Sequence, residues 1–125
     1  MSHAVVLPWP PAELNPNKRL HWAVKRKHAK AYREACCLLA REAKLRAPTD
    51  GRIALWLDFF PPDKRRRDDD NLVAAFKAGR DGLADALGID DKRFVALPYV
   101  QTKTHPGGCV CVSLSYLPRR DAANG

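Results

Sequence analysis

The sequence predicts a single small α/β (α+β) domain, in which a mixed β-sheet packs against two main helices. Three observations lead to this prediction. The chain has 125 residues, which suits one ordinary domain with one core. Apolar residues recur at helical spacings in two segments, and they alternate or run together in four others, as in strands. These segments follow the order β-α-β-α-β-β, which is typical of helices packed on a mixed sheet.

The N-terminal half is expected to hold one short strand and one long helix. The strand ends at Leu7, because three prolines follow at Pro8, Pro10 and Pro11. The spacing of apolar residues then predicts a helix over residues 22–46. Its apolar face comprises Ala29, Tyr32, Cys36, Leu39 and Ala43. A second, basic stripe comprises Arg26, Lys30, Arg33, Arg41 and Lys44, and it is either an ordinary solvated face or a surface for phosphates.

The C-terminal half is expected to hold three strands and the second helix. The apolar segment 52–60 predicts a buried strand. A helix over residues 71–87 follows, and its predicted core positions are Leu72, Ala75, Phe76, Gly79, Leu83 and Ala86. The last two strands, over 93–103 and 109–117, are expected to form a hairpin. Alternation in the final strand predicts one face with Val110, Val112, Leu114 and Tyr116.

Composition narrows the class of protein. Residues 1–118 are assigned to the domain and residues 119–125 to a disordered C-terminal tail. The net charge of +8, with a pI near 9.6, suits a polyanionic partner such as nucleic acid. No apolar run has the length of a membrane span. The four cysteines lack the spacing of a zinc site, which predicts reduced structural thiols and a cytoplasmic protein.

The segment "KRRRDDDNL" places three arginines directly before Asp68, Asp69 and Asp70. Magnesium prefers oxygen ligands and takes few carboxylates, with water and phosphate completing its shell. In an extended segment residues i and i+2 point the same way, so Asp68 and Asp70 could converge on one ion. A second acidic pair, Asp90 and Asp91, follows the second helix. It can join the first group only if the chain doubles back or if a second subunit supplies it.

The alternative for the first acidic group is a helix cap. Asp70 directly precedes the expected helix, and an aspartate there would accept hydrogen bonds from the first backbone amides. One capping aspartate would be sufficient for this, whereas three adjacent carboxylates repel one another unless cations offset them. Metal binding and capping both stay open at this point.

Three segments together carry a resemblance to a known family. "LPWPP" at residues 7–11, "DKRRRDDDNL" at residues 63–72 and the "DD" pair at Asp90 and Asp91 resemble the RusA family, in the same order and at similar spacing over nearly the whole chain. The resemblance implies a small α/β domain that forms a homodimer. It also implies a magnesium-dependent endodeoxyribonuclease that resolves Holliday junctions by paired nicks in DNA recombination and repair.

The resemblance also implies which residues act. Asp68, Asp70 and Asp91 match the metal ligands and catalytic carboxylates, while Asp69 and Asp90 are neighbours without an assigned role. The family often has a functional lysine where this chain has Ala74. The nearest lysine is Lys77, whose segment "KAGRDGL" resembles the family pattern displaced by three residues. Lys77 could replace the missing lysine in catalysis. Otherwise Lys77 is a solvated lysine on the helix face, and catalysis is weaker or uses another base such as Arg67.

Basic and aromatic residues complete the expected site. The residues predicted to bind DNA backbones are Lys18, Arg19, Arg65, Arg66 and Arg67. Trp9 and Trp56 are predicted to lie in the core or in a dimer interface. Two other functions remain open, a nucleic-acid-binding protein without catalysis and a magnesium nuclease for other branched DNA.

Overall fold

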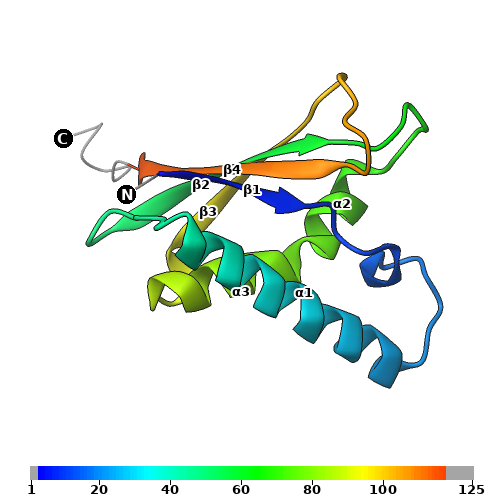
Figure 1. Ribbon diagram of the computed structural model, residues 1–125, viewed down its shortest axis with the longest axis horizontal. Coiled ribbons are helices and arrows are strands. Elements are labelled where there is room, and N and C mark those ends of the chain that lie inside the picture. Colours follow the sequence, from blue (N-terminus) through cyan, green and yellow to red (C-terminus); the bar gives the residue numbers. More distant parts are fainter. Residues whose placement is uncertain (1–2, 118–125) are drawn as a thin grey trace.

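A four-stranded mixed sheet carries the helices on one of its faces (Figure 1). The structure is a computed structural model that describes residues 3–117, so the predicted tail at 119–125 lies outside the described residues. Residues 3–117 form one small α+β domain with three α-helices and two short 3-10 turns. No helix within residues 3–117 is both long enough and apolar enough to cross a membrane.

The strands are β1 (Ala4–Pro8), β2 (Arg52–Phe60), β3 (Phe94–Val100) and β4 (Cys109–Leu117), in the sheet order β1-β4-β2-β3. β4 runs antiparallel to both β1 and β2, whereas β2 and β3 are parallel. The predicted hairpin of the last two strands is therefore wrong, because β2 lies between them. The helical segment between β2 and β3 is a crossover connection of the kind that parallel strands need, and it brings β3 beside β2 rather than beside β4.

The long helix α1 (Trp22–Glu42) ends four residues before the predicted boundary. Lys44 adopts a left-handed conformation with φ of 54°. The amide of Leu45 then donates to the Ala40 carbonyl at 3.0 Å, which closes the helix end. At the other end, Nδ1 of His21 accepts from the amide of Ala23 at 3.2 Å. The predicted apolar face of this helix packs on the core, with Tyr32 and Cys36 buried.

The second predicted helix is broken at Phe76 into α2 (Asp69–Ala75) and α3 (Lys77–Leu87). Phe76 is fully buried and makes edge-to-face contacts with Phe59 at 5.9 Å and Tyr32 at 6.2 Å between ring centroids. A break at this ring lets both short helices pack on the core. Asp70 and Lys77 consequently lie on two separate helices, α2 and α3.

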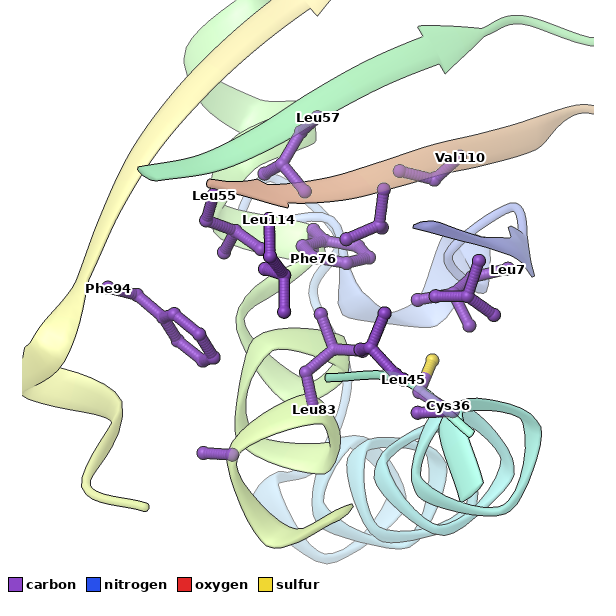
Figure 2. Close-up of a cluster of buried hydrophobic side chains, with 14 of the residues drawn as sticks. Leu7, Cys36, Leu45, Leu55, Leu57, Phe76, Leu83, Phe94, Val110 and Leu114 are labelled. Atoms are coloured by element: carbon purple, nitrogen blue, oxygen red, sulfur yellow. The ribbon is translucent and has the colours of Figure 1, made fainter. Parts of the chain in front are cut away.

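The core lies between the inner face of the sheet and the three helices (Figure 2). Leu55, Leu57, Val110 and Leu114 from the sheet meet Phe76 and Leu83 from the helices. The predicted buried positions of the second helix are confirmed, with Ala86 partly buried. Val110, Val112 and Leu114 are also buried as predicted, whereas Tyr116 is 58% exposed because it lies near the end of β4.

Candidate active site

Lys77 and Asp91, which come from two separate motifs, lie in contact. Lys77 begins α3, and its Nζ lies 3.3 Å from Oδ2 of Asp91 in the turn η2 (Asp91–Arg93) and 3.1 Å from Oδ1 of Asp81. The hydrogen bond from Lys77 lowers the pKa of Asp91. The hydrogen bonds to Asp81 and then to Asp91 raise the pKa of Lys77. The chain therefore doubles back after α3 and brings Asp91 to Lys77, but among the described residues Asp91 makes no contact with Asp68 or Asp70.

Arg80 holds the turn that carries Asp91. One of its guanidinium nitrogens, Nη2, donates to the backbone carbonyls of Asp91 and Phe94, both at 3.1 Å. Its Nε is buried and has no hydrogen-bond partner within the described residues. The charge of Arg80 also contributes to the lowered pKa of Asp91, after the hydrogen bond from Lys77. Arg80 was not predicted from the sequence, although its place three residues after Lys77 sets it on the same side of α3.

The aspartate run begins α2, and Asp68 rather than Asp70 is the cap. Oδ1 of Asp68 accepts from the amides of Asp70 at 2.9 Å and Asn71 at 3.4 Å. Asp69 and Asp70 form the exposed first turn of the helix. Within the described residues, neither of these two carboxylates has a side-chain partner. Capping thus accounts for one oxygen of one aspartate and leaves the other carboxylate oxygens open to solvent.

The carboxylates do not form a closed metal site. Among residues 3–117, no three histidine, cysteine, aspartate or glutamate side chains form a group that could hold a metal ion. An ion shared by Asp68, Asp70 and Asp91 therefore stays a prediction. Magnesium is commonly held by only one or two carboxylates together with water and substrate phosphate. Asp68 and Asp70 each keep a carboxylate oxygen without a partner among the described residues, but Asp70 lies in the first turn of α2, so the extended geometry that was expected to point both side chains at one ion is absent.

The three arginines before α2 have different environments. The Arg67 side chain is 15% exposed, and its Nη2 lies 2.7 Å from Oδ1 of Asp63. Its Nη1 donates to the carbonyls of Asp63 at 2.9 Å and Arg65 at 2.8 Å. The hydrogen bond from the Arg65 amide, followed by that from Arg67, lowers the pKa of Asp63. Arg65 has a 77% exposed side chain, and Arg66 is exposed without a side-chain partner among the described residues. Of these three arginines, Arg66 is free within the described part of the chain, Arg65 is mostly exposed although its Nη2 lies 3.6 Å from Oδ2 of Asp63, and Arg67 is engaged within the protein.

The other predicted basic residues are mostly open to solvent. Lys18 and Arg19 are exposed in the segment between the 3-10 turn η1 (Ala12–Leu14) and α1. Arg33 of the basic stripe is instead committed to Asp85 of α3, with two hydrogen bonds of 2.6 and 2.9 Å. That stripe is thus partly a structural contact between α1 and α3.

A cavity of about 610 Å³ joins the proline-rich segment to the arginine loop. Its walls include Trp9, Pro11, Asn17, Arg66 and Asn71, and Asp68 lies at the same cavity. The basic and acidic members of this wall were predicted from the sequence, whereas its three asparagines, Asn15, Asn17 and Asn71, were not. The cavity lies directly beside the start of α2.

No protein-family model matches the chain. A protein of Xylella fastidiosa (strain Temecula1 / ATCC 700964), described as an "Uncharacterized protein", is 42% identical over 125 residues. That similarity covers 98% of this chain and 81% of the Xylella protein. The chain therefore belongs to the same family as this uncharacterized protein of Xylella fastidiosa.

Proposed function

We propose that the protein is a magnesium-dependent, structure-specific DNA endonuclease that resolves Holliday junctions, like the RusA family that its motifs resemble. The observation that carries the proposal is the 3.3 Å contact between Lys77 and Asp91. Asp91 belongs to the acidic pair that the resemblance assigns to catalysis, and Lys77 lies in the segment that resembles the family's lysine pattern displaced by three residues. The exposed carboxylates at the start of α2 and the net charge of +8 add support.

In this proposal the residues around α2 and α3 have separate tasks. Asp68 and Asp70 offer free carboxylate oxygens to the ion. Bound magnesium supplies polarisation of the scissile phosphate and a lower pKa for the attacking water. Lys77, held cationic by Asp81 and Asp91, adds positive charge beside the phosphate as negative charge develops. Arg65 and Arg66 hold the DNA backbone through contacts that do not depend on base sequence.

The proposal includes a homodimer, because paired nicks need two sites at a fixed spacing. The sheet face opposite the helices exposes Val6, Trp56 and Tyr99, and it offers apolar surface for a second copy. Trp56 is thus not a core residue, whereas Trp9 packs against the core. All four cysteines are free thiols, in keeping with a reducing compartment, and the proposal accordingly places the protein in the cytoplasm.

One cleavage assay tests the proposal. Purified protein is incubated with a labelled four-way junction, a flap, a replication fork and a linear duplex, with and without magnesium. We expect symmetric nicks in the junction that require magnesium and that Asp70→Asn abolishes. Asp50→Asn, an exposed aspartate remote in sequence from these motifs, is the matched control and should cut as the wild type does. Faster cleavage of flaps or forks than of the junction would mean that the protein is a magnesium nuclease for another branched DNA.

A second candidate is a nucleic-acid-binding protein without catalysis. The capping role of Asp68 favours it, as does the lack of a three-carboxylate group among the described residues. This candidate predicts junction binding that does not need magnesium. Tight binding with no nick at any magnesium concentration would replace the nuclease proposal with this one.

A further inference from the structure

The cavity beside α2 has the size of a site for a small ligand. Its volume of about 610 Å³ lies within the range of roughly 300–1,000 Å³ that is common for such sites. It lies between the proline-rich segment and the arginine loop, two parts of the chain joined by the contact of Arg67 with Trp9. That contact, with the ion pair of Arg67 to Asp63, gives the cavity a preformed wall.

The walls divide into apolar, amide and cationic parts. Trp9, Pro11 and Leu72 supply apolar surface. Asn17 and Asn71 supply side-chain amides that make no hydrogen bond within the described residues. An amide both donates and accepts, which suits the edge of a nucleobase more than a phosphate. The ligand should therefore carry a flat, polar-edged group as well as a charge.

The cationic part of the wall specifies that charge. Arg65 and Arg66 line the cavity and are mostly exposed. One guanidinium group can donate two parallel hydrogen bonds to two oxygens of the same phosphate. Asp68 is the carboxylate at the cavity, and one of its oxygens is already used in capping α2. A phosphate at the arginines and a base at the asparagines together describe one nucleotide.

We propose that this cavity takes one unstacked nucleotide of a bound DNA strand. Its base lies against Asn17, Asn71 and Pro11, and its phosphate binds Arg65 and Arg66. A paired base within a duplex cannot enter a pocket of this kind, so the nucleotide must first leave the stack. That step costs a few kcal/mol and costs least for a base that is mismatched or already single-stranded, so the nucleotide is expected at the branch point rather than within an arm. The inference rests on the proposed function, since it assigns the cavity to the strand held beside Asp68.

The test measures binding without cleavage. A four-way junction carries 2-aminopurine, which fluoresces more strongly when unstacked, at each position near the branch point in turn. Protein is added in a buffer with chelator and no metal. We expect binding to raise the fluorescence at one position at least twofold. Asn17→Ala and Asn71→Ala should each remove most of that rise and weaken junction binding about fivefold, as expected for the loss of one hydrogen-bonding group. Thr102→Ala, an exposed polar residue that does not line the cavity, should change neither quantity.

A second arm separates the base from the backbone. An abasic residue at the responding position should weaken wild-type binding about fivefold and leave the affinity of Asn71→Ala unchanged. Unchanged fluorescence at every position, or an abasic residue without effect on the wild type, overturns the inference. Free 2-aminopurine deoxyribonucleoside monophosphate that binds as tightly as the junction overturns the assignment to a DNA strand. Because Asn17 is exposed in a loop, its truncation is tolerated by the fold.

The outcomes also separate this inference from the proposed function. A fluorescence rise without nicking in magnesium would support the cavity as a nucleotide site and contradict the proposal that the protein is a nuclease. Nicking in magnesium without any fluorescence rise retains the nuclease and overturns the cavity site.

Discussion

The guanidinium carbon of Arg67 lies 5.7 Å from the centroid of the Trp9 ring. This contact joins the proline-rich segment after β1 to the loop that precedes α2. Trp9 itself packs edge-to-face on Phe59 of β2, with ring centroids 6.0 Å apart. The two sequence motifs therefore form one structural unit anchored on the sheet, in which Arg67 has a structural role.

The first prediction separates Arg67 from its neighbour Arg66. Arg67→Lys keeps the charge but loses the planar group that bonds Asp63 and two carbonyls and stacks on Trp9. We expect it to lower the free energy of unfolding by about 1–3 kcal/mol in urea denaturation. Arg66→Lys, at an exposed position, should change it by less than about 0.5 kcal/mol. Equal effects of the two substitutions would show that the contacts of Arg67 with Asp63 and Trp9 add nothing to the stability of the protein.

Much of this fold could be predicted from the sequence, because the spacing of apolar and polar residues along the chain shows which side chains are buried in each helix or strand. The alternation in β4 and the helical spacing around Tyr32 and Leu83 identified core residues correctly. The pairing of strands could not be predicted in the same way. Nothing local to β3 states that it joins β2 in parallel while β4 takes the other edge of β2. The break at Phe76 was also missed, because it depends on aromatic rings from α1 and β2 that the local sequence does not contain.

The candidate site was predictable as a set of residues and not as a set of contacts. The spacing of motifs identified Lys77 and Asp91, which lie together. It did not identify Arg80, whose partners are backbone carbonyls and so leave no trace in residue types. It also grouped Arg67 with the free arginines, because the ion pair with Asp63 depends on how the loop folds.

The second prediction concerns the contact between α1 and α3. A Cβ at Gly82 would collide with the Arg33 carbonyl oxygen and would lie 3.1 Å from Cβ of Cys36. Neither backbone nor packed side chain can yield cheaply, so we expect Gly82→Ala to destabilise the protein by about 1–3 kcal/mol in urea denaturation. Ala74→Ser adds one atom at an exposed position of α2 and should be close to neutral. A stable Gly82→Ala protein would mean that α1 and α3 pack less closely than described.

The third prediction concerns the pH dependence of the Arg33–Asp85 pair. The hydrogen bonds from Arg33 lower the pKa of Asp85, so the pair stabilises the fold above the unfolded-state pKa near 4. That stabilisation is lost as the pH falls through the lower folded-state pKa. We expect Asp85→Asn to cost about 0.5–1 kcal/mol at pH 7, since the pair is partly exposed, and progressively less below about pH 4. A double-mutant cycle with Arg33→Gln isolates the pair, and coupling that persists undiminished in acid would contradict the prediction.

The fourth prediction uses salt to count phosphate contacts. Each cation that binds a phosphate releases counterions, so the slope of log affinity against log salt reports the number of such contacts. We expect Arg65→Ala and Arg66→Ala each to reduce the magnitude of that slope by about 1 for junction DNA. Arg33→Ala, at a residue already paired with Asp85, should leave the slope nearly unchanged. A similar fall for all three variants would mean that the basic stripe of α1 also contacts the backbone.

The fifth prediction concerns Arg80 as a positioning residue for Asp91. Arg80→Lys retains a cation but cannot span the carbonyls of Asp91 and Phe94 as the guanidinium does. We expect a loss of stability of about 1–3 kcal/mol, together with junction cleavage slowed about tenfold, because the turn no longer holds Asp91 against Lys77. Junction affinity measured in chelator should stay near the wild-type value, since Arg80 is largely covered by the protein. Lys92→Ala, an exposed cation in the same turn, is the control for a simple loss of charge. If Arg80→Lys cleaves bound junction DNA as fast as the wild type does, Arg80 acts through its charge alone and does not position Asp91.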